Sequence, residues 1–240
     1  MSTVTKRSLA LLTTWWFAAS TGASADTPKP AIVHFQSDNH ELGGELFRPE
    51  GEGPFPVVLY NHGSAPGMLN SRASAVIGPL FVARGWAFFM PYRRGQGLSE
   101  GAGAYIGDAI DAARRQHGQA DAAATMVNLL ATEQLRDQLA ALAWLKTQPY
   151  IDASRVAVAG NSFGGIETVL GVADAPYCAA VDASGCAESW QEAPQLQAAM
   201  KQAVRNAKAP IFSFKPRTTM TCRQARSCRP KCKASASPIC

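Results

Sequence analysis

Residues 160–164 read Gly-Asn-Ser-Phe-Gly, the G-x-S-x-G pattern of a serine nucleophile. In this pattern Ser162 lies on a sharp turn between a strand and a helix, and Gly160 and Gly164 leave room where a Cβ atom would clash. A serine hydroxyl is a weak nucleophile at neutral pH and needs a neighbouring base. In the fold that carries this turn, an acid and then a histidine follow the serine along the chain. Here all four histidines precede it: His34, His40, His62 and His117.

The residues on either side of the pattern support this interpretation. Residues 155–159 form a short apolar run that predicts a buried strand, and residues 163–170 predict the start of a helix. A strand, the glycine-flanked serine and then a helix is the context that the pattern requires. The alternative is an ordinary serine in a glycine-rich turn, and these flanking segments argue against it.

A second segment fits the same site. Residues 56–61 predict a buried strand that runs directly into His62, Gly63 and Ser64. In the hydrolase fold a loop at this point supplies one backbone N–H of the oxyanion hole, and the residue after the nucleophile, here Phe163, supplies the other. We therefore expect Ser64 to donate its backbone N–H, while His62 and Gly63 support the loop.

Three segments in this order, residues 60–64, 91–99 and 160–165, carry a resemblance to a known family. The chain resembles the α/β-hydrolase superfamily, and within it the dienelactone hydrolase-like and prolyl oligopeptidase-like proteins, from about His34 to about Phe214. The resemblance implies cleavage of a small-molecule ester through an acyl-enzyme on Ser162. Two alternatives stay open: a peptidase of the prolyl oligopeptidase type, and a non-catalytic binding protein on the same scaffold.

The remaining patterns predict the α/β-hydrolase fold, a mostly parallel sheet with helices on both faces, truncated at its C-terminal end. Residues 31–35 and 45–48 predict a leading antiparallel pair of strands. Further strands are expected over residues 86–90, 179–182 and 210–214, and helices over residues 70–83 and 120–147. Residues 101–118 are predicted to form a mobile loop near the site. His117 in this loop is the first candidate for a substitute base.

The N-terminus predicts export. Lys6 and Arg7 precede a short apolar stretch, and Ala23-Ser24-Ala25 follows it, as in a secretory signal peptide. We expect cleavage after Ala25, a secreted or periplasmic location and no stable membrane anchor after cleavage. Residues 26–214 then form one incomplete hydrolase domain.

The C-terminal segment differs from the rest of the chain. Residues 215–240 hold seven basic residues, no acidic residue and four of the six cysteines. Without this segment the chain carries 16 basic and 18 acidic residues, so the excess of positive charge belongs to the segment alone. A basic tail that binds nucleic acid or anionic lipid, and a cysteine-rich metal site, are the direct interpretations. Export argues against nucleic acid as a partner, and the cysteine spacing lacks the paired C-x₂-C clusters of common zinc sites.

A shifted reading frame accounts for the segment better. If the frame begins one base earlier, the codons of Met220 and Thr221 force an aspartate, and a glutamine follows Phe214 if the frame is open there. Such a frame permits a strand end that resembles the acid-bearing segment of these hydrolases. We therefore expect residues 215–240 to be a disordered frameshift product, and the lost frame to hold the acid and the histidine.

Two further expectations concern thiols and cofactors. Cys178 and Cys186 are the only cysteines before residue 215. Export permits a disulfide between them, which would require a turn around Ser184-Gly185, but we favour two free thiols. No H-E-x-x-H pattern, P-loop or dinucleotide fingerprint occurs, so we expect no metal and no nucleotide cofactor.

Overall fold

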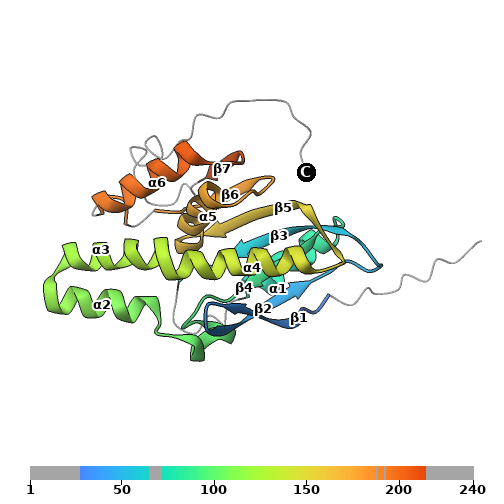
Figure 1. Cartoon of the computed structure of the whole chain (residues 1–240), viewed down its shortest axis with the longest axis horizontal. Helices are drawn as coiled ribbons and strands as arrows, with labels where there is room; N and C mark the ends of the chain where they lie inside the picture. The colour runs from blue at the N-terminus through green and yellow to red at the C-terminus, as the bar shows by residue number, and fades with distance from the viewer. Residues whose placement is uncertain (1–27, 65–71, 187–188, 192, 215–240) are drawn as a thin grey trace, which may run out of the picture.

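A computed structural model describes residues 28–64, 72–186, 189–191 and 193–214. Its centre is a sheet of seven strands in the order β1-β2-β4-β3-β5-β6-β7 (Figure 1). The strands are β1 (Ala31–Ser37), β2 (His40–Phe47), β3 (Phe55–Asn61), β4 (Ala87–Pro91), β5 (Ile151–Asn161), β6 (Ala180–Ala183) and β7 (Ile211–Phe214).

The pairing of the strands confirms the predicted sheet. β1 pairs with β2, and β2 pairs with β4, both antiparallel. From β4 through β3, β5 and β6 to β7 every pair is parallel. The carboxyl ends of β3, β4 and β5 therefore meet at one edge of the sheet, which brings together the three motifs that the sequence singled out.

Helices cover both faces of the sheet, as predicted. The α-helices are α1 (Ala73–Val82), α2 (Ile106–His117), α3 (Gln119–Leu129), α4 (Leu135–Thr147), α5 (Phe163–Asp174) and α6 (Pro194–Asn206), with a 3₁₀ segment η2 (Gly97–Ala102) and a π-helical segment η3 (Leu130–Gln134). α4, α5 and α6 pack on one face and α1 on the other. Figure 1 shows α3 and α4 running in line, with α4 in front of the sheet and α3 extending beyond it.

The core has two parts because the sheet separates them. The larger part lies between the sheet and α3 to α6, and its most buried side chains include Leu59, Val158 and Leu145. The smaller part lies between the sheet and α1, around Phe47 and Phe88. The apolar positions predicted along residues 120–147 face the larger part. Leu130, Leu135, Leu142 and Leu145 are buried there, and Leu129 and Leu139 pack at its margin.

The prediction of a loop over residues 101–118 is wrong, because Ile106–His117 form helix α2. Ile106 and Ile110 lie four residues apart, so they share one helix face, and both are buried. Asp108 in the first turn and Arg114 and Arg115 in the last complement the helix dipole. α2 packs antiparallel against α3 as a helical hairpin that extends beyond the sheet (Figure 1).

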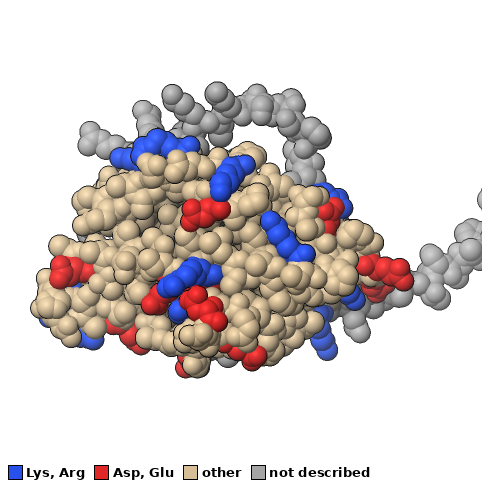
Figure 2. Space-filling view, in the orientation of Figure 1, with Lys and Arg blue, Asp and Glu red and all other residues tan. Residues whose placement is uncertain are grey.

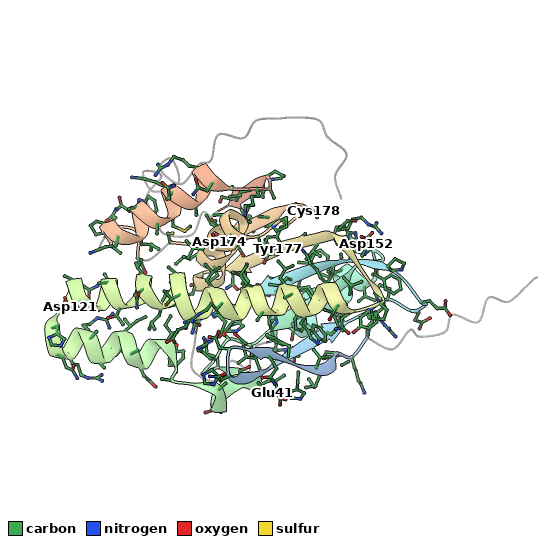
Figure 3. All side chains as sticks on the ribbon, in the orientation of Figure 1. Glu41, Asp121, Asp152, Asp174, Tyr177 and Cys178 are labelled. Carbon is green, nitrogen blue, oxygen red and sulfur yellow. The ribbon has the colours of Figure 1, made fainter. Side chains whose placement is uncertain are left out.

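The prediction of free thiols is wrong for Cys178, because the structure places it in a disulfide. Cys178 follows α5 and lies beside Tyr177, near the start of β6 (Figure 3). Cys186 is buried, with 4% of its surface exposed.

The predicted signal peptide over residues 1–25 and the predicted frameshifted tail over residues 215–240 lie outside the described residues. Among the helices of the described part, none is both long and apolar enough to span a bilayer. The face shown in Figure 2 carries acidic and basic side chains interspersed on a mostly uncharged surface.

Candidate active site

Ser162 occupies the turn between β5 and α5. The strand ends at Asn161 and the helix begins at Phe163, so only the serine separates them. Its backbone angles are φ 54° and ψ −122°, a conformation that residues other than glycine rarely adopt. The Ser162 carbonyl accepts the backbone N–H groups of Gly165 (2.9 Å) and Ile166 (3.2 Å), and its N–H donates to Ala183 of β6 (3.1 Å). The turn is thus held from both sides, and the serine itself is exposed.

The glycines of the motif allow three segments to cross closely. A Cβ atom on Gly160 would lie 2.2 Å from the carbonyl oxygen of Gly164. A Cβ atom on Gly164 would lie 2.0 Å from the carbonyl oxygen of Asn61, at the end of β3. Both distances are far below van der Waals contact, so the close approach of β3, β5 and α5 requires glycine at these positions.

The loop predicted to form the oxyanion hole lies beside the serine. A Cβ atom on Gly63 would be 3.6 Å from the Cβ atom of Ser162 and 3.1 Å from the side-chain nitrogen of Asn161. The hydroxyl of Ser64 donates to the Tyr105 hydroxyl oxygen at 3.3 Å, which joins the loop to the start of α2. The parallel pairing of β3 with β5 brings the two motifs together, although about 100 residues separate them.

His62 is buried beneath this loop, with 1% of its surface exposed. Its Nδ1 lies 2.6 Å from the carbonyl oxygen of Gly63, and its Nε2 accepts the backbone N–H of Arg93 at 3.3 Å. The neutral ring with its proton on Nδ1 satisfies both contacts. Burial, reinforced by the charge of Arg93, holds the pKa of His62 well below its usual value of 6.5. Both ring nitrogens are therefore engaged, and neither is free to take a proton from Ser162.

The other three histidines lie away from the serine. His34 is on β1, exposed, and pairs with Glu41 at 3.5 Å, and His40 begins β2. The suggestion that His117 is a substitute base in a loop over the site is wrong, because His117 is the last residue of α2. It lies where α2 turns into α3, at the end of the hairpin that is remote from the sheet (Figure 1). All four histidines of the chain are thus accounted for, and none is placed to activate Ser162.

Asp182 is the buried carboxylate at the end of β6. Its Oδ1 accepts the N–H of Gly185 (2.7 Å), and its Oδ2 accepts the hydroxyl of Ser213 on β7 (2.9 Å). Burial raises the pKa of Asp182, and these two hydrogen bonds oppose the rise. A Cβ atom on Gly165 would lie 2.4 Å from Oδ1. Asp182 therefore ties β6 and β7 together against the first turn of α5.

Sequence reasoning missed a layer of buried polar side chains beneath the turn. Asn61 donates to Gln138 of α4 (3.1 Å) and to Thr168 of α5 (3.1 Å). Arg93 pairs with Glu167 of α5, and Arg94 pairs with Asp137 of α4. Glu167 was the one visible signal, because it is the only charged residue of α5 before Asp174 and a buried charge needs a partner.

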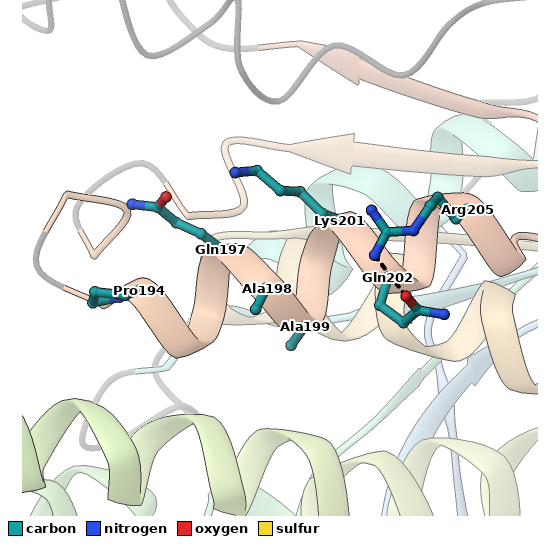
Figure 4. A pocket seen from close by; sticks show the side chains of 7 residues that line it. All are labelled: Pro194, Gln197, Ala198, Ala199, Lys201, Gln202 and Arg205. Carbon is teal, nitrogen blue, oxygen red and sulfur yellow. Dashed lines mark hydrogen bonds between the residues drawn. The ribbon is translucent and has the colours of Figure 1, made fainter.

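We also searched the described residues for a metal site and for a pocket at the predicted site residues. Within the part of the chain that the structure describes, no three metal-ligating side chains gather. A hollow of about 580 Å³ lies along α6, between Pro194 and Arg205 (Figure 4). One helix supplies its whole lining, and it includes none of the predicted site residues.

Comparisons with known proteins agree with this geometry. The profile of the prolyl oligopeptidase family matches residues 117–193, which contain the serine motif. A search of curated proteins found no match.

Solved structures share the fold. Acylaminoacyl peptidase from Pyrococcus horikoshii is 20% identical, with a TM-score of 0.56 over 79% of this chain. A puromycin-hydrolyzing peptidase from Mycobacterium tuberculosis is 17% identical, with a TM-score of 0.56 over 82% of this chain. The chain spans 32% of the length of each of these two proteins. The 2,6-dihydroxy-pseudo-oxynicotine hydrolase is 17% identical, with a TM-score of 0.53 over 78% of this chain and 52% of its own. The chain therefore has the α/β-hydrolase fold, and the resemblance predicted from its three motifs is confirmed.

Proposed function

We propose that this chain is built as a serine hydrolase of the dienelactone hydrolase or carboxylesterase type, with Ser162 as its nucleophile. The observation that carries the proposal is the backbone of Ser162, held at φ 54° between β5 and α5 with the Gly63 loop beside it. Strained backbone that is held from several sides is concentrated at functional sites. An exposed serine on such a turn is available to an ester substrate.

The proposed reaction is acyl transfer. The Ser162 oxygen attacks the ester carbonyl carbon, and the carbonyl electron pair moves onto the oxygen. The backbone N–H groups of Phe163 and Ser64 stabilise that oxyanion. When the tetrahedral intermediate collapses, the alcohol leaves and the acyl group stays on Ser162. Water then releases the acid. Each half of the reaction needs a base to take a proton and an acid to return it.

We further propose that the chain is catalytically incomplete. No histidine is in place to take the proton of Ser162, because His62 is engaged and the other three lie elsewhere. The acid and the base would follow β7 in the frame that we expect to have been lost after Phe214. Sequencing the gene across the codon of Phe214 tests this directly. An immediate stop in the shifted frame, or a frame without an aspartate and then a histidine, contradicts it.

The activity test uses p-nitrophenyl acetate. A site that keeps its oxyanion hole but lacks triad members retains roughly 10³–10⁴-fold catalysis over water, which does not depend on the serine. The chain and Ser162→Ala are therefore expected to differ little in plain buffer. Added imidazole supplies the missing base, so a Ser162-dependent release of p-nitrophenol should then appear. Equal rates for both proteins with imidazole would overturn the assignment of Ser162.

Peptide substrates are the second candidate, favoured by the match to the prolyl oligopeptidase family over residues 117–193. Comparing an acetyl ester with the matching amide under the same conditions separates the two classes. A non-catalytic binding role is the outcome if neither substrate gives Ser162-dependent cleavage.

We also propose export to the periplasm or the medium, a small-molecule partner and no nucleic-acid partner. Mass analysis of the mature N-terminus tests the cleavage expected after Ala25.

A further inference from the structure

A buried ion pair lies beneath the serine turn. Arg93 follows β4, and Glu167 lies on α5, five residues after Ser162. Their exposed fractions are 3% and 0%, and Nη1 of Arg93 donates to Oε2 of Glu167 at 3.2 Å. Among the described residues, none donates a hydrogen bond to the other carboxylate oxygen. A buried ion pair gives little net stability, so stability alone does not account for its presence.

Both Nη atoms of Arg93 also donate to the oxyanion loop, whereas its Nε has no hydrogen-bond partner among the described residues. Nη1 also donates to the carbonyl oxygen of His62 (2.8 Å), and Nη2 donates to the carbonyl oxygen of Gly63 (3.1 Å). The carbonyl of Gly63 belongs to the same planar peptide unit as the N–H of Ser64. A donor that fixes the direction of this carbonyl therefore also fixes the direction of the Ser64 N–H. His62 supplies the second donor to the same oxygen.

We propose that Arg93 is a positioning residue for the oxyanion hole: its guanidinium sets the plane of the Gly63–Ser64 peptide, and Glu167 holds the guanidinium in place from the helix that carries the nucleophile. The catalytic meaning of this placement rests on the proposed function, in which the Ser64 N–H stabilises the oxyanion. The rigid fork of an arginine suits the task, because it reaches two carbonyls and a carboxylate at once.

The charge of Glu167 provides a way to perturb the pair. Burial, with a smaller contribution from Asp137 on α4, raises the pKa of Glu167 to about 7, and Arg93 opposes the rise. Of the neighbouring groups, Tyr177 beyond α5 interacts with the charge of Glu167, neutral His62 contacts Arg93, and Arg94 pairs with Asp137. Protonation of Glu167 near neutral pH weakens its hold on Arg93, so the orientation of the Ser64 peptide should respond to pH in this range.

The direct test is the backbone amide resonance of Ser64 in ¹H–¹⁵N spectra of the full chain, compared among three variants. Arg93→Lys keeps the charge but loses the fork, and Glu167→Gln keeps the shape but loses the charge. Arg94→Lys is the matched control, because Arg94 is the adjacent arginine, is also buried, and has Asp137 and Asp38 as its partners. Arg93→Lys should shift the Gly63 and Ser64 resonances, and Arg94→Lys should leave them in place. Unchanged resonances in Arg93→Lys, or equal shifts in the control, overturn the proposal.

A pH titration keeps the proposal testable if Arg93→Lys fails to fold. The chemical shift of the Ser64 amide should change with a midpoint near pH 7 in the unmodified chain, as Glu167 ionises. In Glu167→Gln this change should be absent. Identical titration curves for the two proteins overturn the proposal.

Catalysis gives a separate readout. With p-nitrophenyl acetate and imidazole, the Ser162-dependent rate should fall by about tenfold or more in Arg93→Lys, with a small change in KM, because a misplaced donor costs transition-state stabilisation. An unchanged rate contradicts the positioning role. If no Ser162-dependent rate exists at all, the proposed function fails, while the amide resonances still decide whether Arg93 sets the peptide.

Discussion

At the scale of single residues, the turn that carries Ser162 depends on close backbone contacts at Gly160 and Gly164. The carbonyl of Gly164 lies where a side chain on Gly160 would begin, and the carbonyl of Asn61 lies where a side chain on Gly164 would begin. The serine turn is therefore a crossing of β3, β5 and α5 and not an isolated local structure. Its geometry depends on two residues without side chains.

Gly164→Ala tests this crossing. The added methyl group would lie 2.0 Å from a backbone oxygen that cannot move without displacing β3. We expect the free energy of unfolding to fall by about 3 kcal/mol, as for overpacked sites, in urea titrations. Gly101→Ala is the control, because nothing lies within 4 Å of its added Cβ atom, and it should change stability by less than about 0.5 kcal/mol. Equal effects would mean that the crossing is not tight.

His62 and Glu167 give opposite contributions to the pH dependence of stability. The pKa of His62 is lower in the folded state than its usual 6.5, so folding releases a proton and stability rises with pH up to that value. The pKa of Glu167 is raised from 4.5 to about 7, so folding takes up a proton. Its contribution is fully present below pH 4.5 and is lost as the pH rises through about 7.

Glu167→Gln should therefore change the shape of the stability curve. The stability of the variant relative to the unmodified chain should increase steadily between pH 4.5 and pH 7, because the variant no longer has to ionise a buried carboxyl group. Urea unfolding at three pH values across this window measures it. A difference that stays constant across the window would contradict the raised pKa of Glu167.

Among the elements, α3, η3 and α4 form one continuous helical run, of which α4 packs on the sheet and α3 extends beyond it. The π-helical segment at Leu130–Gln134 passes the chain from α3, which packs against α2, to α4, which packs against the sheet. Asp137 and Gln138 on α4 reach Arg94 and Asn61 at the carboxyl edge of the sheet. The helix therefore supports the site through polar contacts as well as through apolar packing.

Truncation of a buried leucine on α4 tests the apolar part. Leu145 has no exposed surface and lies in the larger core, whereas Leu129 on α3 lies only at its margin. Leu145→Ala should lower the free energy of unfolding by about 2–5 kcal/mol, through lost burial and the cavity that remains. Leu129→Ala should cost about 1 kcal/mol. Similar losses in the two variants, measured by thermal or urea unfolding, would contradict the assignment of faces.

For the molecule as a whole, the two edges of the described sheet differ. β1 forms one edge and β7 the other. On β7 the rings of Phe212 and Phe214 lie side by side, 6.0 Å apart, and are 62% and 47% exposed. They project from the face opposite Ile211, which is buried in the larger core. An exposed apolar edge strand is a site for self-association.

Replacing both rings should reduce association of the chain. Phe212→Ser with Phe214→Ser removes the apolar pair while leaving the backbone pairing with β6 in place. We expect light scattering at a fixed protein concentration to fall severalfold relative to the unmodified chain. Ile32→Ser on β1 is the control, because this residue is 51% exposed at the opposite edge and stands without such a ring pair. An equal fall of light scattering in Ile32→Ser would show that association depends on exposed apolar side chains in general and not on the Phe212–Phe214 pair.

Local sequence patterns determined much of the secondary structure around the candidate site. The strand–serine–helix context of Ser162 and the strand before His62 depend on residues within a few positions of each other, and both lie where predicted. The parallel part of the sheet was predictable because β3 to β7 contain short apolar runs, whereas the mixed sequence of β2 (His40–Phe47) hid its start, which was predicted at residue 45. Helix α2 was missed because the glycines between residues 101 and 118 suggest a loop, although the spacing of Ile106 and Ile110 was a helical signal.

Only the tertiary structure decided which distant residues meet. Arg93 and Glu167 are 74 positions apart, and nothing near either one specifies the other. The contact of Arg93 with the Gly63 carbonyl depends on the parallel pairing of β3 with β4. The sequence likewise did not determine the protonation state of His62, because the ring is kept neutral by burial and by the guanidinium of Arg93. Local conformation follows from short-range sterics and patterning, whereas charge, protonation and the direction of a peptide depend on groups that the fold brings together.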